Sequence, residues 1–65
     1  MMAIKKLYGR DGRYLGEQVD QTDRVKLYGS DGRYLGEYMK YEDRTYDGSG
    51  GYVGSGNLLG ALLTV

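Results

Sequence analysis

The chain has 65 residues, in which nine Lys and Arg balance nine Asp and Glu, and Gly and Tyr supply twelve and eight positions. It contains no Cys, His, Pro, Trp or Phe. The lack of Cys and His excludes a disulfide framework, a zinc site of the usual kind, and thiol or imidazole catalysis. The zero net charge argues against an electrostatically driven nucleic-acid binder. A chain this short forms at most one domain, here 1–65, and buries only about 60% of its unfolded surface.

The first residues of the chain carry Lys5 and Lys6 but no apolar run behind them, so they do not resemble a secretory signal. The longest apolar stretch, 58–65, is interrupted by Gly60 and Thr64. It is far shorter than the roughly 20 residues of a bilayer-spanning helix. By default we expect a soluble cytoplasmic protein.

An internal repeat dominates the sequence. Residues 6–17 (KLYGRDGRYLGE) recur as residues 26–37 (KLYGSDGRYLGE), with the one difference that Ser30 replaces Arg10. A third copy at 45–55 keeps the Tyr and Gly positions but loses the Arg and the Glu. The shared unit, Tyr-x-x-[Asp/Ser]-Gly-x-Tyr-[Leu/Val]-Gly, predicts repeated structural units rather than a chance similarity.

Each unit predicts a β-hairpin, because Asp-Gly between short runs with Tyr and Leu tolerates the positive φ of a tight turn. Polar connectors at 20–23 and 42–43 read as turns between the hairpins. We therefore expect an all-β meander of three hairpins that curls into a small barrel or petal arrangement. The expected hairpins are 4–23, 24–43 and 44–56, with strands at about 4–9, 13–19, 24–29, 33–41, 44–47 and 51–55.

Two registers are open for the hairpins. In the first hairpin, a two-residue turn at Asp11-Gly12 pairs Tyr8 with Leu15 and Lys6 with Glu17. A three-residue loop at 10–12, ending in a left-handed Gly and a bulge, pairs Tyr8 with Tyr14 and Leu7 with Leu15. We favour the second, since it places the two Leu on one face and the two Tyr on the other. The choice matters because a one-residue slip moves every side chain to the opposite face.

A glycine follows each Leu or Val of the repeat, at Gly16, Gly36 and Gly54. These glycines lie inside predicted strands, where Gly usually marks a bend, a bulge or a close approach of another backbone. We expect each hairpin to bend or to cross another segment there.

The tail, 57–65, departs from the repeat. Asn57 is an acceptable helix N-cap, and the segment behind it is apolar on every side, which is typical of a buried or membrane-facing element. A helix this short is not stable alone, so we expect a short apolar C-terminal helix packed on the hairpins. Its core, plug or interface residues are Leu58, Leu59, Leu62, Leu63 and Val65. The alternative is an exposed anchor for a membrane, a lipid or a partner.

The burial that the chain can achieve favours a buried tail. Ordering 65 residues opposes folding by about 100 kcal/mol, and the hairpins contain few aliphatic side chains to offset it. The core remains thin even with the tail included. Since an open six-stranded sheet also leaves two edges that pair readily, we expect a homo-oligomer.

The eight tyrosines have two interpretations. As a structural ladder, cross-strand aromatic pairs would stabilise the sheet, because the chain has no Phe or Trp to do so. As a binding surface, they would stack a carbohydrate, choline or a lipid head group, or single-stranded nucleic acid, beside Arg residues; the net charge makes nucleic acid the weakest of these. We expect two of the tyrosines, at 38 and 41, to be exposed. The candidate ligand-binding residues are Tyr14, Arg13, Tyr34, Arg33, Tyr38 and Tyr41.

Other polar patterns predict little chemistry. The recurring Lys and Glu at 6, 17, 26 and 37 indicate a solvated face with weak cross-strand ion pairs. Asp11 and Asp31 lie in turns, where Asp serves the backbone, so we expect no catalytic carboxylate. The Gly-rich stretch 48–56 lacks the Gly-Lys-Ser/Thr of a phosphate loop and the ligands of a calcium loop. We expect no enzyme, no metal and no cofactor.

The unit resembles the hairpins of β-flower proteins, small bacterial repeat proteins of the form Tyr-Asp-x-x-Gly-Arg-Tyr-x-Gly. The resemblance covers most of residues 6–55. It implies hairpins that splay like petals around a barrel related to the tubby-like fold, with an apolar C-terminal segment in the middle. The matching residues are Tyr8, Asp11, Gly12, Arg13, Tyr14 and Gly16, then Tyr28, Asp31, Gly32, Arg33, Tyr34 and Gly36, then Tyr46, Asp47, Gly50, Tyr52 and Gly54.

Two further families resemble the unit less closely. The choline-binding repeats share its period of twenty residues and its Tyr, Asp-Gly and Gly, but they build their cation cage from Trp. The YD repeats share Tyr-x-x-x-Gly-Arg but occur in long arrays. The leading expectation is therefore a non-catalytic structural or interaction module that self-associates, with a ligand-binding module and a tail anchor as alternatives.

Overall fold

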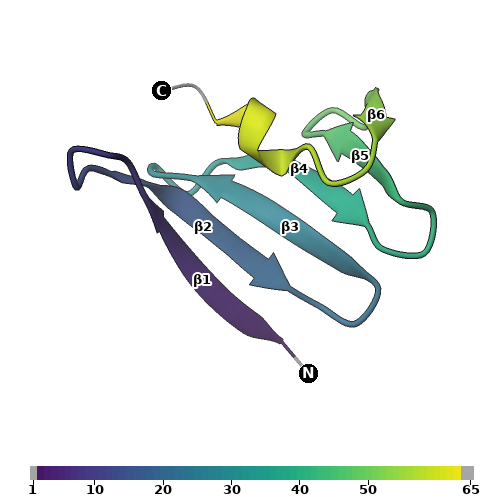
Figure 1. Ribbon diagram of the computed structural model, residues 1–65, viewed down its shortest axis with the longest axis horizontal. Helices are drawn as coiled ribbons and strands as arrows, with labels where there is room; N and C mark the ends of the chain where they lie inside the picture. The colour runs from purple at the N-terminus through teal and green to yellow at the C-terminus, as the bar shows by residue number, and fades with distance from the viewer. Residues whose placement is uncertain (1, 64–65) are drawn as a thin grey trace.

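The computed structural model describes residues 2–63 and shows six strands in one antiparallel sheet (Figure 1). The strands follow one another across the sheet in chain order, so the predicted three-hairpin meander is confirmed. The predicted strand 33–41 begins one residue too early and ends two residues too late, because the chain turns after Met39, whose carbonyl accepts the Asp43 N–H at 2.9 Å. The strands are β1 Ala3–Tyr8, β2 Tyr14–Asp20, β3 Arg24–Gly29, β4 Tyr34–Met39, β5 Arg44–Asp47 and β6 Tyr52–Ser55.

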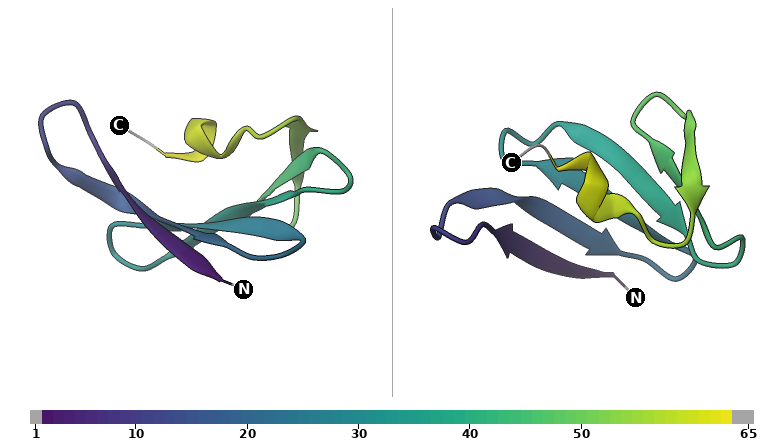
Figure 2. Two further views of the ribbon diagram at one scale, coloured as in Figure 1. Left: turned by 60° about the horizontal axis from the view of Figure 1, so that its bottom comes forward. Right: turned by 45° about the horizontal axis from the view of Figure 1, so that its top comes forward.

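The sheet curves but does not close. Its order runs from β1 to β6 without a pairing between these two strands, so residues 2–63 form one open sheet, and the barrel or petal arrangement stays a prediction. Two causes act together: β5 and β6 have only four residues each, and the chain leaves β6 to cross the concave side. Figure 2 shows the curved sheet with the C-terminal segment inside its concave side.

The three hairpin tips have the same hydrogen bonds. In each tip, the backbone N–H of the residue before the loop donates to the backbone carbonyl of the residue after it. The donors are Gly9, Gly29 and Asp47, and the distances are 2.7, 2.8 and 2.8 Å. A glycine with φ between 84° and 92° ends each loop and donates back at 3.0 Å. The three-residue loop with a left-handed glycine is therefore confirmed, and the carboxylates of Asp11 and Asp31 each accept a backbone N–H two residues on at 3.0 Å.

The register of the hairpins agrees with the prediction at the tyrosines and differs at the leucines. Tyr8 lies opposite Tyr14 as expected, but Leu7 lies opposite Gly16 and not opposite Leu15. Between these two pairs, β2 contains one more residue than β1. This extra residue is Leu15, which forms a bulge and has no partner on β1. The same shift occurs in the other two hairpins.

The glycine behind each bulge is a point of close approach, as predicted. A Cβ on Gly16 would lie 2.1 Å from the carbonyl oxygen of Tyr28, and one on Gly36 would lie 2.5 Å from that of Tyr46. Both glycines are buried and both have positive φ, at 148° and 157°. The neighbouring hairpin can approach only because these residues have no side chain.

The tail forms a single 3₁₀ turn, η1 Leu59–Leu62, and the predicted C-terminal helix is wrong in this respect. The segment is one turn long and contains Gly60, which disfavours a longer helix. The residue before the turn is Leu58, although the Oδ1 atom of Asn57 accepts the Leu59 N–H at 3.1 Å.

Thr45 fixes the tail to the sheet. Its hydroxyl donates to the carbonyl of Gly56 at 2.7 Å and accepts the N–H of Leu58 at 3.0 Å. Thr45 is fully buried, as are Leu27 of β3 and Leu59 of η1, which are the buried hydrophobic side chains among residues 2–63. The core of the described chain is therefore small and lies between β3, β4, β5 and η1.

Candidate functional site

Six tyrosines line the face of the sheet opposite η1, which we call the tyrosine face. Strand alternation and the register place them there together with Lys6, Glu17, Lys26 and Glu37. The rings form one pair within each hairpin, with centroids 5.7, 5.7 and 5.9 Å apart and tilted planes. This geometry is that of stabilising aromatic pairs. The pairs are Tyr8–Tyr14, Tyr28–Tyr34 and Tyr46–Tyr52.

Charged residues on this face follow a ladder that repeats from one hairpin to the next. Glu17 lies between Lys6 of β1 and Tyr28 of β3. Glu37 lies between Lys26 and Tyr46 in the same way. Opposite charges on neighbouring strands are favourable, although exposed pairs contribute little.

Arg24 makes the ion pairs that are resolved on this face. Its guanidinium lies 3.1 Å from Asp23 and 3.4 Å from both carboxylate oxygens of Glu37. The hydrogen bond from Arg24 lowers the pKa of Asp23, and the two acidic partners, Asp23 first, raise the pKa of Arg24. Among the described residues, a further salt bridge joins Lys40 to Asp20 at 2.6 Å, across the two connectors between hairpins.

Tyr34 is the tyrosine whose protonation is most perturbed. Burial, followed by the hydrogen bond and charge of Glu37, raises the pKa of Tyr34 to about 12. Both effects disfavour the phenolate, because a charged ring would lose water and face a carboxylate.

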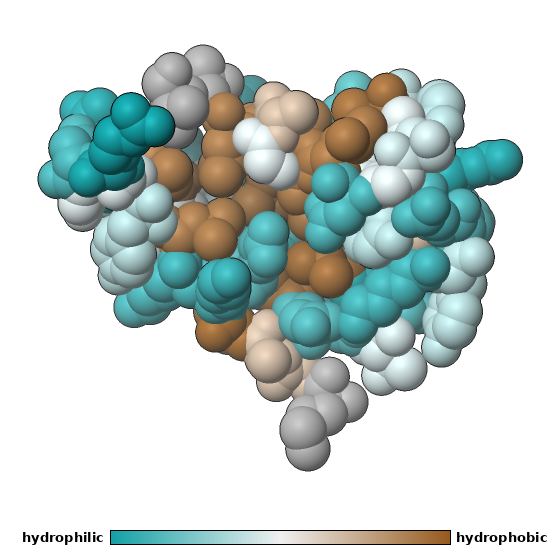
Figure 3. Space-filling view, in the orientation of Figure 1, coloured by the Kyte–Doolittle hydropathy of each residue, from teal (hydrophilic) through white to brown (hydrophobic). Residues whose placement is uncertain are grey.

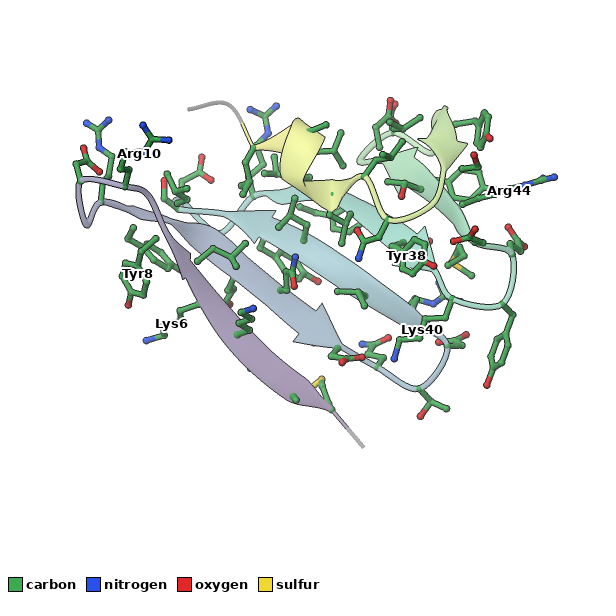
Figure 4. All side chains as sticks on the ribbon, viewed as in Figure 1. Lys6, Tyr8, Arg10, Tyr38, Lys40 and Arg44 are labelled. Carbon is green, nitrogen blue, oxygen red and sulfur yellow. The ribbon has the colours of Figure 1, made fainter. Side chains whose placement is uncertain are left out.

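The structure does not bring the six candidate ligand-binding residues together. Tyr14 and Tyr34 lie on the tyrosine face, and Arg13 and Arg33 follow the loops at two hairpin tips. Tyr38 lies on the other face, half-buried, where its hydroxyl donates to the Oδ1 atom of Asp43 at 2.7 Å (Figure 4). The prediction that it is exposed is wrong.

Tyr41 is 82% exposed in the connector after β4, in agreement with the prediction. It lies apart from the paired rings, since its position in a turn places it outside the sheet. Tyr38 and Tyr41 therefore do not extend the tyrosine face.

Two contacts of the third hairpin were missed by sequence reasoning. The guanidinium of Arg44 lies 5.9 Å from the centroid of the Tyr52 ring, a cation–π contact. Arg44 lies opposite Met39, just as Lys26 lies opposite Val19 one hairpin earlier. The basic residue at this position of the repeat could therefore have been predicted to lie on the tyrosine face. The buried hydroxyl of Thr45 had no such signal, because it depends on where the tail docks.

Two open hollows adjoin the sheet. The first lies between the first two hairpin tips and is lined by Arg10, Arg13, Tyr14 and Ser30, among others. The second lies beside the third tip, where Tyr34, Glu37 and Tyr46 contribute to its lining. The hydroxyl of Tyr46 donates to Glu42 at 3.0 Å at the rim of this second hollow.

The predicted core residues of the tail differ in burial. Leu59 is fully buried, Leu62 and Leu63 are half-buried, and Leu58 is 37% exposed. Val65 lies outside the described residues. Figure 3 shows hydrophobic side chains gathered over the middle of this face, with hydrophilic side chains around them.

Strand β1 forms one open edge of the sheet within residues 2–63. Five of the six residues of β1 are exposed, and Ile4 and Met2 just before it are 58% and 60% accessible. Gly9 bonds to Arg13 across the hairpin, and backbone direction alternates along a strand. The backbone groups of Ile4, Lys6 and Tyr8 therefore point away from β2.

Residues 2–63 contain no group of three or more acidic side chains arranged to hold a metal ion. No helical segment in the same range has the length and hydrophobicity that a bilayer-spanning helix requires. Comparison of the chain with protein-family models, curated proteins and solved structures finds no match. The function must therefore be argued from the surfaces themselves.

Proposed function

We propose that the chain is a non-catalytic interaction module that self-associates through the open edge of its sheet. The observation that carries this proposal is the unpaired β1 strand, whose outward backbone groups and exposed Ile4 have no partner within residues 2–63. Unpaired strand edges pair readily with other strands. Among residues 2–63, Leu27 and Leu59 are the hydrophobic side chains that are fully buried, and this small core adds a reason, since an interface would bury further apolar surface.

Antiparallel pairing of two β1 strands about Ile4 avoids like charges. It sets the two exposed Ile4 side chains opposite each other and sets Lys5 and Lys6 opposite Ala3 and Met2 of the second copy. Pairing about Lys5 or Lys6 sets two lysines face to face, which is destabilising. Our proposal takes the Ile4-centred register because it also buries the two Ile4 side chains against each other.

The experiment is sedimentation equilibrium over a hundredfold range of protein concentration, with thermal unfolding at both ends of the range. Self-association raises both the mass and the Tm with concentration. The variant Ile4→Pro blocks the edge without removing a bond to β2, because the Ile4 N–H points outward. We expect it to weaken association while Ile4→Val does not. A wild-type chain that stays monomeric throughout contradicts the proposal.

We further propose the architecture that the β-flower resemblance implies, with the tail as the plug of the assembled sheets. Its support is the burial of Leu59 and the anchoring of the tail by Thr45 on the concave side. Circular dichroism and mass of a chain ending at Asn57 test it. Unfolding or a changed subunit number is expected, whereas a truncated chain with unchanged fold and mass would favour the tail as a membrane or partner anchor.

A second candidate function is binding of an anionic head group in the hollow between the first two tips. Arg10, Arg13 and Tyr14 line this hollow, whereas Ser30 replaces the equivalent Arg in the second unit. Titration of intrinsic Tyr fluorescence with a phosphorylated head group tests it. We expect a saturable change that Arg13→Ala weakens and Arg33→Ala leaves intact; choline and neutral oligosaccharides serve as the comparison ligands.

A further inference from the structure

The junctions between hairpins show what kind of strand this protein accepts at a sheet edge. Strand β3 receives β2 with Tyr28 opposite Glu17 and Lys26 opposite Val19. Strand β5 receives β4 by the same rule, with Tyr46 opposite Glu37 and Arg44 opposite Met39. The receiving strand offers a tyrosine and a basic residue, and the incoming strand supplies a glutamate and an aliphatic residue.

A glycine of the incoming strand is the second element of the rule. Gly16 and Gly36, each directly before the glutamate, lie so close to the receiving strand that a Cβ would be 2.1 or 2.5 Å from the carbonyl oxygen of its tyrosine. A Cβ atom cannot lie that close to a backbone oxygen, so this position of the incoming strand must be glycine. The incoming strand therefore has the form Gly-Glu-x-[Val/Met].

Strand β1 offers the same receiving edge without an incoming strand. Tyr8 and Lys6 occupy the places of Tyr28 and Lys26, as their pairing with Tyr14 and Glu17 shows. Figure 4 shows Lys6 and Tyr8 projecting from the outer margin of β1. Their backbone groups point away from β2, so both the side chains and the hydrogen-bonding groups of the edge are in place.

The chain's own unpaired strands satisfy this edge poorly. Strand β6 carries Ser55 in the place of the glutamate, and the chain turns away at Gly56 toward η1. Strand β1 of a second copy can pair here without facing lysines, but it contains no acidic residue to lie opposite Tyr8. The two strands that fit the rule, β2 and β4, are already paired on both sides.

We infer that the β1 edge docks an extended segment of another protein, of the form Gly-Glu-x-[Val/Met], as an additional antiparallel strand. Main-chain bonds to Ile4, Lys6 and Tyr8 supply affinity, as in other cases of strand addition, and the glycine and glutamate supply specificity. The glutamate lies opposite Tyr8 and the aliphatic residue lies opposite Lys6. The inference rests on the proposed interaction role of the β1 edge, but it names a partner other than a second copy.

The test uses a peptide that copies residues 13–21, RYLGEQVDQ, added to the isotope-labelled full chain at the lowest practical concentration. We expect amide shifts and slowed hydrogen exchange at Ile4, Lys6 and Tyr8, and none at Ser55. The same peptide with Gly16→Ala should bind about tenfold more weakly or worse, since a close-packed position cannot accept the added methyl group. A peptide with Glu17→Lys should also lose affinity, because its new lysine would lie opposite Tyr8 and diagonal to Lys6 on the same face.

Equal binding of the Gly16→Ala peptide, or shifts at β6 in place of β1, overturns the inference. The mass of the free chain, measured in the same series, separates this result from the proposed function. A chain that self-associates but ignores the peptide retains the proposed function and loses the inference. A monomeric chain that binds the peptide loses self-association and retains the docking edge.

Discussion

The second and third hairpins differ most clearly at one equivalent position, Leu27 in β3 and Thr45 in β5. Each lies opposite the glycine behind the bulge, and each is fully buried. Leu27 contributes an apolar side chain to the core, whereas Thr45 contributes two hydrogen bonds that hold the tail. The third copy therefore differs from the repeat in a way that serves the fold, because Thr45 in place of Leu lets it bind the tail.

The first hairpin completes this comparison. Leu7 is the equivalent of Leu27, but it is only half-buried, because η1 packs against β4 and not against β1. The same residue in the same repeat thus has different importance in the two hairpins. Position relative to the tail, not the repeat sequence, decides which side chains form the core.

The largest expected effect tests this difference directly. Leu27→Ala should lower the free energy of unfolding by about 2–5 kcal/mol, because it opens a cavity in the small core. Urea unfolding followed by circular dichroism measures it. Leu7→Ala is the matched control, and an equal loss in the two variants would contradict the assigned core.

Thr45→Val should lower the free energy of unfolding by about 1–3 kcal/mol, because the Gly56 carbonyl and the Leu58 N–H lose their partner. Thr45→Ser keeps the hydroxyl and should retain most of the stability. Hydrogen exchange at Leu58 gives a local measurement, in which only the Val variant should lose protection. Unchanged exchange at Leu58 in Thr45→Val would show that the tail does not depend on this residue.

Gly36→Ala should destabilise the fold by about 1–3 kcal/mol, since the new Cβ would lie 2.5 Å from the backbone oxygen of Tyr46 and 2.6 Å from the Cδ1 atom of Leu62 in the tail. Gly54→Ala meets a methyl group at the flexible end of Leu58, so its loss should be smaller. Because both variants meet a tail methyl group and only Gly36→Ala meets a backbone oxygen, the difference between them in thermal unfolding measures the backbone junction. Equal losses would mean that the β4–β5 approach is not the cause.

The smallest effect concerns pH. The pKa of Tyr34 is raised to about 12 in the folded chain, so the unfolded chain loses this proton first as pH rises above about 10. Stability should therefore fall between about pH 10 and pH 12, by less than about 1 kcal/mol because Tyr34 is partly exposed. Tyr34→Phe should flatten this part of the curve, whereas Tyr41→Phe should not. Parallel curves for Tyr34→Phe and the wild type would refute the assignment.

The order of the strands could be predicted because its signals are local. Asp-Gly or Ser-Gly followed two residues later by tyrosine fixed all three tips, and the Tyr8–Tyr14 pairing followed from the loop length. The predicted pair of Leu7 with Leu15 was wrong, because a second bulge at Leu15 shifts Leu7 opposite Gly16. The glycine of the repeat indicated a bend, a bulge or a close approach there, but the segment that approaches it belongs to the neighbouring hairpin and could not be read from local spacing.

The surfaces were less predictable than the strands. The tyrosine pairs followed from the repeat, but the half-buried position of Tyr38 depends on Asp43, which has a positive φ of 55° in the turn after β4. The 3₁₀ form of the tail and the role of Thr45 depend on docking across the concave side. Sequence spacing predicts the hairpins, but it does not predict how the tail docks across them.

The meander order has a kinetic consequence. Every strand pairs only with its neighbours in the chain, and Thr45 reaches the tail within 13 residues. Since the strands within residues 2–63 pair with their neighbours in the chain, the entropy of loop closure presents only a small barrier to forming the sheet, and the longer-range contact of η1 with β4 follows. We expect each hairpin to zip from its own tip and the tail to dock last, so that folding is fast despite an all-β architecture.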